Sequence, residues 1–158
     1  MKRSLLALSL ILGLASCSNL PRMAGKVPPD FYLSDQSGKI WETQKLRQET
    51  YVLDFWATWC APCVASIPDL NRYQELHGAK VKLLGIAIEE KGWAVVKPFI
   101  AEHDIRYPVA TGLGSLAAAY GIDSFPTLLI IHDGKVVSQL QGRHSLAEIE
   151  AALAPYLN

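Results

Sequence analysis

A buried strand that runs into two cysteines and then directly into a helix constrains this chain more than any other feature. Residues Tyr51–Ala57 (YVLDFWA) are dense in aromatic and branched side chains, which is typical of a buried β-strand. From Ala61 to His77 the apolar residues fall on one helical face, and Pro68 predicts a kink there. Cys60 and Cys63 therefore lie where a strand gives way to a helix N-terminus.

This position predicts a reactive pair of thiols. Unpaired backbone N–H groups and the positive end of the helix dipole both favour a thiolate over a thiol. We expect Cys60 to be the exposed attacking thiolate and Cys63 the shielded thiol that resolves a mixed disulfide. Two alternatives stay open: an inert structural disulfide, although so short a loop gains little chain entropy, and a Cu(I) site, although no Met or His lies beside the pair.

Composition narrows the class of protein. The 158 residues are 50% hydrophobic, and 15 Lys and Arg balance 15 Asp and Glu, which argues against both a disordered chain and nucleic-acid binding. Three cysteines are too few for a disulfide-stapled miniprotein or a four-thiolate zinc site. We expect one globular domain without a metal or other cofactor. The histidines have no metal-ligand spacing and are expected at the surface, at His77, His103, His132 and His144.

The other patterns predict a mixed sheet with helices on both faces. Asp133-Gly134 suits a type I′ turn between two strands, and Ser145 with Glu148 forms a capping box. The expected elements around the central strand and helix are a hairpin at Phe31–Leu33 and Lys39–Trp41, a strand at Val81–Ile88, helices at Trp93–His103 and Ser115–Tyr120 with Ser115 as the cap, strands at Thr127–His132 and Lys135–Leu140, and a helix from Ser145 to about Leu157.

The first 16 residues have the pattern of a secretory signal. Lys2 and Arg3 precede an apolar run that is shorter than the roughly 20 residues of a membrane span. Its end, Leu14-Ala15-Ser16-Cys17, resembles the lipobox of bacterial lipoproteins, which implies cleavage before Cys17 and a diacylglycerol on its thiol. An ordinary secretory signal is the alternative. Lipidation of Cys17 would leave Cys60 and Cys63 as an even pair in an oxidising compartment.

Residues 17–26 are expected to form a flexible tether to the domain at 27–158. The segment Ser18–Lys26 is small and polar and contains Pro21 and Gly25. No polybasic patch assists membrane binding, so the acyl chains alone would anchor the protein. Nine residues extend at most about 30 Å, which would hold the active site close to the bilayer.

The segment Val52–Cys63 (VLDFWATWCAPC) resembles the active-site stretch of thioredoxins, and FWATWCAPC is most similar to their TlpA/ResA-like branch. The resemblance runs from about Pro28 to the C-terminus. It implies an α/β protein with the thioredoxin fold, in which a mixed central β-sheet is flanked by helices and preceded by an N-terminal β-hairpin. It also implies a thiol:disulfide oxidoreductase.

The same resemblance assigns a substrate groove. Phe125-Pro126-Thr127 matches the family's cis-proline loop, which lies against the two cysteines and offers backbone groups to an extended substrate chain. Proline is the residue for which a cis peptide bond costs little, although an ordinary trans proline is the alternative. Trp59 and Pro62 would line the groove beside Phe125 and Thr127.

Two acidic residues complete the expected site. An unpaired carboxylate in a buried strand costs several kcal/mol, so the pKa of Asp54 should rise; pairing with a core lysine is the alternative. In thioredoxins such an acid takes the proton of the resolving thiol. ResA-like proteins carry a functional glutamate near the end of the strand that matches Val81–Ile88, and Glu90 corresponds to it. Glu89 is also possible. The alternative is that both acids merely lie in solvent at a strand end.

We therefore expect a monomeric, lipid-anchored, extracytoplasmic reductant of disulfides in envelope proteins, recharged by a membrane electron donor. Ala61-Pro62 adds no cation to stabilise the Cys60 thiolate, which favours a reductant over an oxidant. Apocytochrome c is one substrate class of the family. Ser18 after the lipidated cysteine favours the outer membrane in a Gram-negative host. The alternatives are an oxidant or isomerase of secreted disulfides, and a Cu(I) metallochaperone or thiol-binding module.

Overall fold

A mixed five-stranded sheet forms the centre of the protein. The computed structural model describes residues 23–157, so the expected signal at 1–16 and Cys17 lie outside the described residues. The strand order is β5-β4-β3-β6-β7; β3, β4 and β5 run parallel, whereas β6 is antiparallel to β3 and to β7. The bounds are β3 Tyr51–Trp56, β4 Lys82–Ile88, β5 Val109–Gly112, β6 Thr127–His132 and β7 Lys135–Gln141.

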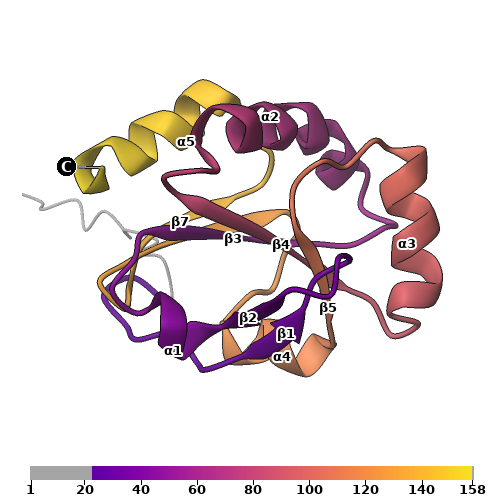
Figure 1. The fold of residues 1–158 in the computed structure, drawn as a ribbon, viewed down its shortest axis with the longest axis horizontal. Helices are drawn as coiled ribbons and strands as arrows, with labels where there is room; N and C mark the ends of the chain where they lie inside the picture. The colour runs from indigo at the N-terminus through magenta and orange to yellow at the C-terminus, as the bar shows by residue number, and fades with distance from the viewer. Residues whose placement is uncertain (1–22, 158) are drawn as a thin grey trace, which may run out of the picture.

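Helices and a hairpin cover the two faces of this sheet (Figure 1). The helices α2 (Ala61–His77) and α5 (Leu146–Leu153) cover one face, and α3 (Trp93–Glu102) packs into the same core. The other face carries α1 (Thr43–Leu46), α4 (Gly114–Ala119) and the antiparallel hairpin of β1 (Tyr32–Ser34) and β2 (Ile40–Glu42). The expected fold class, with its N-terminal hairpin, is therefore confirmed.

The turn, the helix cap and the buried strand that the sequence predicts are all present where expected. Asp133 and Gly134 both have positive φ, at 48° and 71°, as a type I′ turn requires. The Ser145 hydroxyl accepts the Glu148 N–H while the Glu148 carboxylate accepts the Ser145 N–H, so the capping box is complete. β3 is buried at every position, as its composition predicts.

The expected elements differ from the observed ones at four places. Neither α1 nor β5 was predicted, because stretches of four residues are too short to show a period. Ser115 does not cap α4: the helix begins one residue earlier, after Leu113, with no side-chain cap. The last α-helix stops at Leu153 and a 3-10 turn (Ala154–Tyr156) follows, because Pro155 has no N–H to continue the α-helical ladder.

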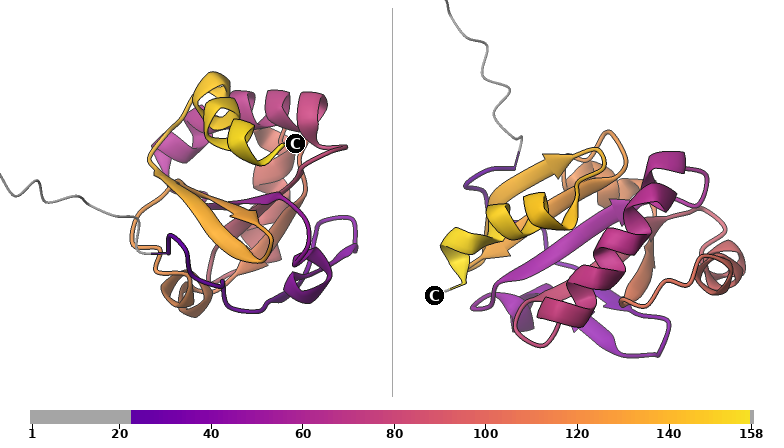
Figure 2. Two further views of the ribbon diagram at one scale, coloured as in Figure 1. Left: turned by 90° about the vertical axis from the view of Figure 1, so that its left-hand side faces the viewer. Right: turned by 90° about the horizontal axis from the view of Figure 1, so that it is seen from above.

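The start of the described chain packs on the edge strand β7. The Gly25 N–H donates to the Val136 carbonyl at 2.8 Å, and the Val136 N–H donates to the Lys26 carbonyl at 2.9 Å. Met23 is buried against the core on the hairpin face. Figure 2 shows this indigo segment beside the orange strands. Residues 23–26, expected in the tether, thus belong structurally to the domain.

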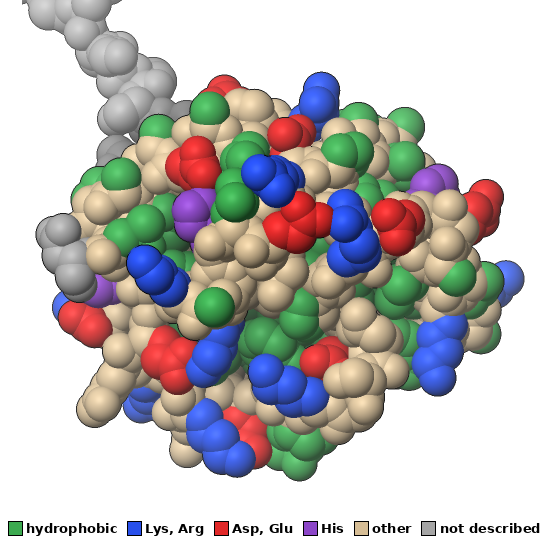
Figure 3. Space-filling model, turned by 45° about the horizontal axis from the view of Figure 1, so that its top comes forward, with side chains coloured by type: hydrophobic (Ala, Val, Ile, Leu, Met, Phe, Trp, Pro, Cys, Tyr) green, Lys and Arg blue, Asp and Glu red, His purple; other side chains and the backbone are tan. Residues whose placement is uncertain are grey.

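Charges of both signs are interspersed on the surface. On the face that includes α2 and α5, Lys and Arg side chains alternate with Asp and Glu side chains without a patch of one sign (Figure 3). Arg106 contacts Glu75 there, and Arg143 contacts Asp69. Between residues 23 and 157, no helix combines the length and apolar character needed to cross a bilayer.

Candidate redox site

The two cysteines occupy the junction between β3 and α2. Their sulfur atoms are bonded, with the two Cα atoms 5.2 Å apart. Cys60 is the N-cap of α2, and its Sγ accepts the Cys63 N–H at 3.3 Å. Pro62 lies in the first turn of the helix, where its missing N–H has no helical partner to lose. The Cys63 N–H, which also donates to the Cys60 carbonyl at 3.0 Å, thus meets the sulfur expected to attack.

Both cysteines are buried in this oxidised state, whereas the exposed Cys60 expected above is the thiolate of the reduced protein. Cys60 is 5% exposed and Cys63 is 4% exposed. Both side chains belong to the core that contains Trp56 and packs against Phe125. Trp59, immediately before Cys60, is instead 71% exposed.

An aromatic pair and a cis proline flank the disulfide. The Phe125–Pro126 peptide bond is cis, as the resemblance implies. The ring of Phe125 meets the ring of Trp59 edge to face, with centroids 5.8 Å apart. Thr127 is fully buried; it begins β6 and pairs with Phe55, while its hydroxyl donates to the Ser124 carbonyl. The cis-proline loop therefore reaches the active-site segment through Phe125.

Asp54 lies in the middle of β3 on the face that packs under α2. Strand alternation puts its side chain on the same face as Val52 and Trp56, which share a core with both cysteines. Burial raises the pKa of Asp54 to about 7. Its Oδ1 has no hydrogen-bond partner in residues 23–157. Burial is the one cause of the shift in its pKa, so the alternative of pairing with a lysine in this part of the chain is wrong.

The surroundings of Asp54 include groups that sequence reasoning missed. Asp54 pairs with Gly85 of β4, and a Cβ at Gly85 would lie 2.8 Å from the Tyr107 ring and 3.0 Å from Trp56 Nε1. Burial, and then the charge of Asp54, raise the pKa of Tyr107 well above its ordinary value. The available signal was Gly85 itself, because a glycine inside an apolar strand often marks a close approach by a neighbour.

The structure distinguishes the two candidate glutamates at the end of β4. Glu89 Oε1 accepts the Thr58 N–H at 2.7 Å and the Thr58 hydroxyl at 2.6 Å. Thr58 lies two residues before Cys60, so Glu89 holds the loop that leads into the cysteines. Glu90 is exposed and lines the same groove as Glu89. Of the two candidates, it is therefore Glu89 that contacts the loop before Cys60.

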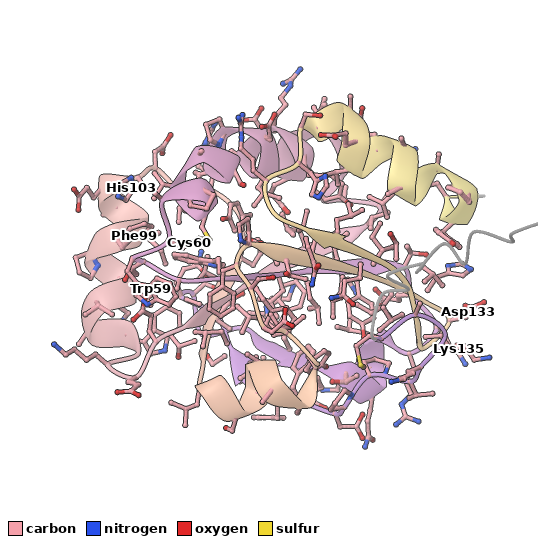
Figure 4. The ribbon with its side chains drawn as sticks, turned by 180° about the vertical axis from the view of Figure 1, so that it is seen from behind. Trp59, Cys60, Phe99, His103, Asp133 and Lys135 are labelled. Atoms are coloured by element: carbon pink, nitrogen blue, oxygen red, sulfur yellow. A yellow bond between two sulfur atoms is a disulfide. The ribbon has the colours of Figure 1, made fainter. Side chains whose placement is uncertain are left out.

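A groove of about 490 Å³ lies beside the exposed tryptophan. It is lined by Trp59, Ile88, Glu89, Glu90, Lys91, Val95 and Gly114. At this end of the molecule, Trp59 and Cys60 lie near Phe99 of α3 and near His103, which follows this helix (Figure 4). We call the end formed by Trp59, Cys60, Glu89, Phe125 and Pro126 the redox pole.

The histidines lie apart from one another at half-buried positions. His77 contacts Glu150, His132 contacts Thr50, and His103 stacks on Phe99. Within the described range 23–157, no three His, Cys, Asp or Glu side chains group to form a possible metal site.

Comparison with protein families gives a match over nearly the whole described chain. The family model described as Redoxin matches residues 23–153. A protein named thiol-disulfide oxidoreductase ResA from Bacillus thuringiensis (strain Al Hakam) is 34% identical over 132 residues, which cover 82% of this chain and 76% of the relative.

Solved structures agree with the sequence comparison. A putative thiol:disulfide interchange protein DsbE from Chlorobium tepidum has a TM-score of 0.76 at 26% identity, over 85% of this chain and 98% of that one. The exposed lipoprotein thioredoxin Etrx1 from Streptococcus pneumoniae strain TIGR4 has a TM-score of 0.72 at 29% identity, over 80% and 99% of the two chains.

Proposed function

Because this chain belongs to the Redoxin family and is a thiol-disulfide oxidoreductase, we propose that it works outside the cytoplasm as a lipid-anchored reductant of disulfides in envelope proteins. The observation that carries the catalytic part is the Cys60–Cys63 disulfide at the N-terminus of α2, where a backbone N–H meets the Cys60 sulfur. That donor and the helix dipole stabilise a Cys60 thiolate once the bond is reduced.

The reaction consists of two thiol–disulfide exchanges. In the reduced protein, the Cys60 thiolate attacks one sulfur of a substrate disulfide, forms a mixed disulfide and releases the other substrate sulfur as a thiolate, which water protonates. Cys63 loses its proton, and its thiolate then attacks the Cys60 sulfur, breaks the mixed disulfide and releases the second substrate sulfur as a thiolate, which water protonates. Two electrons pass to the substrate, and the protein is left with the disulfide that the structure contains.

Asp54 is suited to receive the proton that Cys63 must lose. A carboxyl whose pKa is raised to about 7 exchanges a proton near neutral pH. It lies on the sheet face under α2, in the layer that holds both cysteines. Release of substrate from the mixed disulfide should therefore be the step that depends on Asp54.

The residues between the cysteines support a reductant. Ala61 and Pro62 provide neither a positive charge nor a side-chain donor to the Cys60 sulfur. A strong oxidant such as DsbA has a potential of about −120 mV because its thiolate is strongly stabilised, whereas the potential of thioredoxin is about −270 mV. We place this protein on the reducing side, and a dithiol donor in the membrane must reduce its disulfide after each turnover.

The lipid anchor is supported by the segment Leu14–Cys17 and by a relative. Etrx1, which shares the fold at 29% identity, is described as an exposed lipoprotein. Cleavage before Cys17 and acylation of its thiol would attach the domain to the outer surface of a bacterial membrane. The mass of the mature protein tests this step, because the lipid mass should vanish in Cys17→Ser.

The catalytic proposal is tested by potential and by trapping. Equilibration with dithiol buffers should give a potential clearly below about −180 mV, and a higher value would favour the oxidant or isomerase alternative. In the native host, Cys63→Ala should accumulate a mixed disulfide on Cys60 and so identify the substrate, apocytochrome c included. The absence of any disulfide-linked partner, together with background insulin reduction by the unmodified protein, would contradict the enzymatic role.

A further inference from the structure

The chain enters its domain at the end of the sheet opposite the disulfide. Gly25 and Lys26 pair with Val136, which pairs with Ile131, and Ile131 pairs with Tyr51, the first residue of β3. Cys60 follows the other end of β3. Figure 4 shows Asp133 and Lys135 at one end of the molecule and Trp59 and Cys60 at the other. We call the end formed by Gly25, Lys26, Asp133, Lys135 and Val136 the tether pole.

The length of β3 separates the two poles. From Tyr51 to Trp56 the strand advances about 17 Å, at about 3.3 Å per residue, and Cys60 lies beyond its end. A domain of this size measures on the order of 35 Å across. The disulfide is therefore well removed from the point where the chain joins the sheet.

The segment between Cys17 and the packed chain could at most match this separation if it were fully extended. Met23 is 7% exposed and residues 25 and 26 are hydrogen-bonded to β7, so only residues 18–22 connect Cys17 with the packed chain. A chain of that length extends at most about 20 Å. To bring the disulfide to the bilayer, nearly all of this length would have to run back along the sheet.

We propose that the tether pole faces the anchoring membrane, and that the disulfide faces away from it and exchanges electrons with proteins in the aqueous space. This inference rests on the lipid at Cys17 in the proposed function. What the tether holds close to the bilayer is thus the Asp133–Gly134 turn and not the active site. The substrate is then an extended polypeptide presented from the aqueous side, where Trp59 is exposed. The membrane donor must likewise present its cysteines on a domain that stands on the order of 35 Å above the bilayer.

Fluorescence quenching by lipid headgroups tests this orientation. The full chain carrying Cys60→Ser and Cys63→Ser is expressed with its lipid and reconstituted in vesicles of phosphatidylethanolamine and phosphatidylglycerol that contain headgroup-nitroxide phosphatidylcholine. Lys135→Cys at the tether pole and Lys91→Cys at the redox pole are labelled with bimane in separate samples. Both lysines are exposed and both changes remove one positive charge, so the pair is matched. We expect several-fold stronger quenching at position 135 than at position 91.

Equal quenching at the two positions, or stronger quenching at 91, would overturn the orientation. An insertion of about twelve Gly and Ser residues between Arg22 and Met23 serves as the second variant, and it should reduce the difference because a longer coil lets the domain turn. Two parallel measurements separate this result from the proposed function. A mature mass without lipid would refute the anchor, whereas insulin reduction by the unmodified protein reports the oxidoreductase activity regardless of orientation.

Discussion

The two ends of the sheet differ in how they are held together. At the redox pole, side chains from distant parts of the sequence meet: Glu89 binds Thr58, and Phe125 contacts Trp59. At the tether pole, a two-residue turn joins adjacent strands and the entering chain adds backbone pairs to Val136. The comparison teaches that the cysteines and the entry point of the described chain lie at opposite ends of β3. Substitutions at one pole should therefore leave the other unaffected.

Loss of the attacking sulfur should have the largest effect on this comparison. Cys60→Ser removes the nucleophile, so insulin reduction should fall to the uncatalysed background. Lys135→Ala, at the tether pole, should leave the rate unchanged because the side chain is exposed and distant. The measurement is the initial rate with dithiothreitol as donor. A substantial loss of rate in Lys135→Ala would show that the poles are coupled.

Asp54→Asn should stabilise the protein in a pH-dependent manner. The pKa of Asp54 is raised from 3.8 to about 7, so its contribution to stability is full below about pH 4 and is lost as the pH rises through 7. At pH 8 the variant should gain up to about 4 kcal/mol over the unmodified protein, and the gain should vanish near pH 4. Urea unfolding of both oxidised proteins across this range measures it. A gain that is independent of pH would mean that Asp54 does not titrate as proposed.

Met23→Ala tests whether the entering chain contributes to the fold. Removing this buried side chain should cost about 2 kcal/mol, because it leaves space in the core shared with Phe31 and Leu46. The alkylation rate of Cys60 in the reduced protein should not change. Thermal unfolding and iodoacetamide kinetics give the two readouts. Unchanged stability would place the end of the tether after Met23 instead of before it.

Glu89→Gln and Glu90→Gln form a matched pair within the redox pole. Glu89→Gln weakens the two charge-assisted bonds to Thr58 and should cost about 1–2 kcal/mol. Glu90→Gln removes the same charge from an exposed neighbour and should cost less than about 0.5 kcal/mol. Urea unfolding compares them. The reverse order of effects would mean that Glu90, and not Glu89, supports the active-site loop.

Much of the site was predictable because its signals are local. The strand composition of Tyr51–Ala57, the helix that begins after Cys60 and the Asp133-Gly134 turn each depend on residues within a few positions of one another. A buried acid at Asp54 also follows from its place inside an apolar strand. Such interactions are set by backbone sterics, hydrogen bonding and desolvation, which a short segment already contains.

The partners of these residues were not predictable in the same way. Glu89 and Glu90 are adjacent acids at a strand end, and the sequence does not distinguish them. The short strand β5 forms because β4 pairs along one edge, while the Gln36 side chain bonds the Val109 N–H on the other. Each outcome depends on how segments far apart in the chain align.

The amino-acid sequence by itself determined that two cysteines lie at a helix N-terminus behind a buried strand and acid, and so determined the class of chemistry. Only the tertiary structure decided which glutamate supports the loop, that Tyr107 occupies the space over Gly85, and that residues 23–26 pack on β7 at the end remote from the disulfide. The physical reason is the range of the interactions: dipoles, caps and turns act within a few residues, whereas strand register and the packing of distant side chains exist only once the whole sheet has formed.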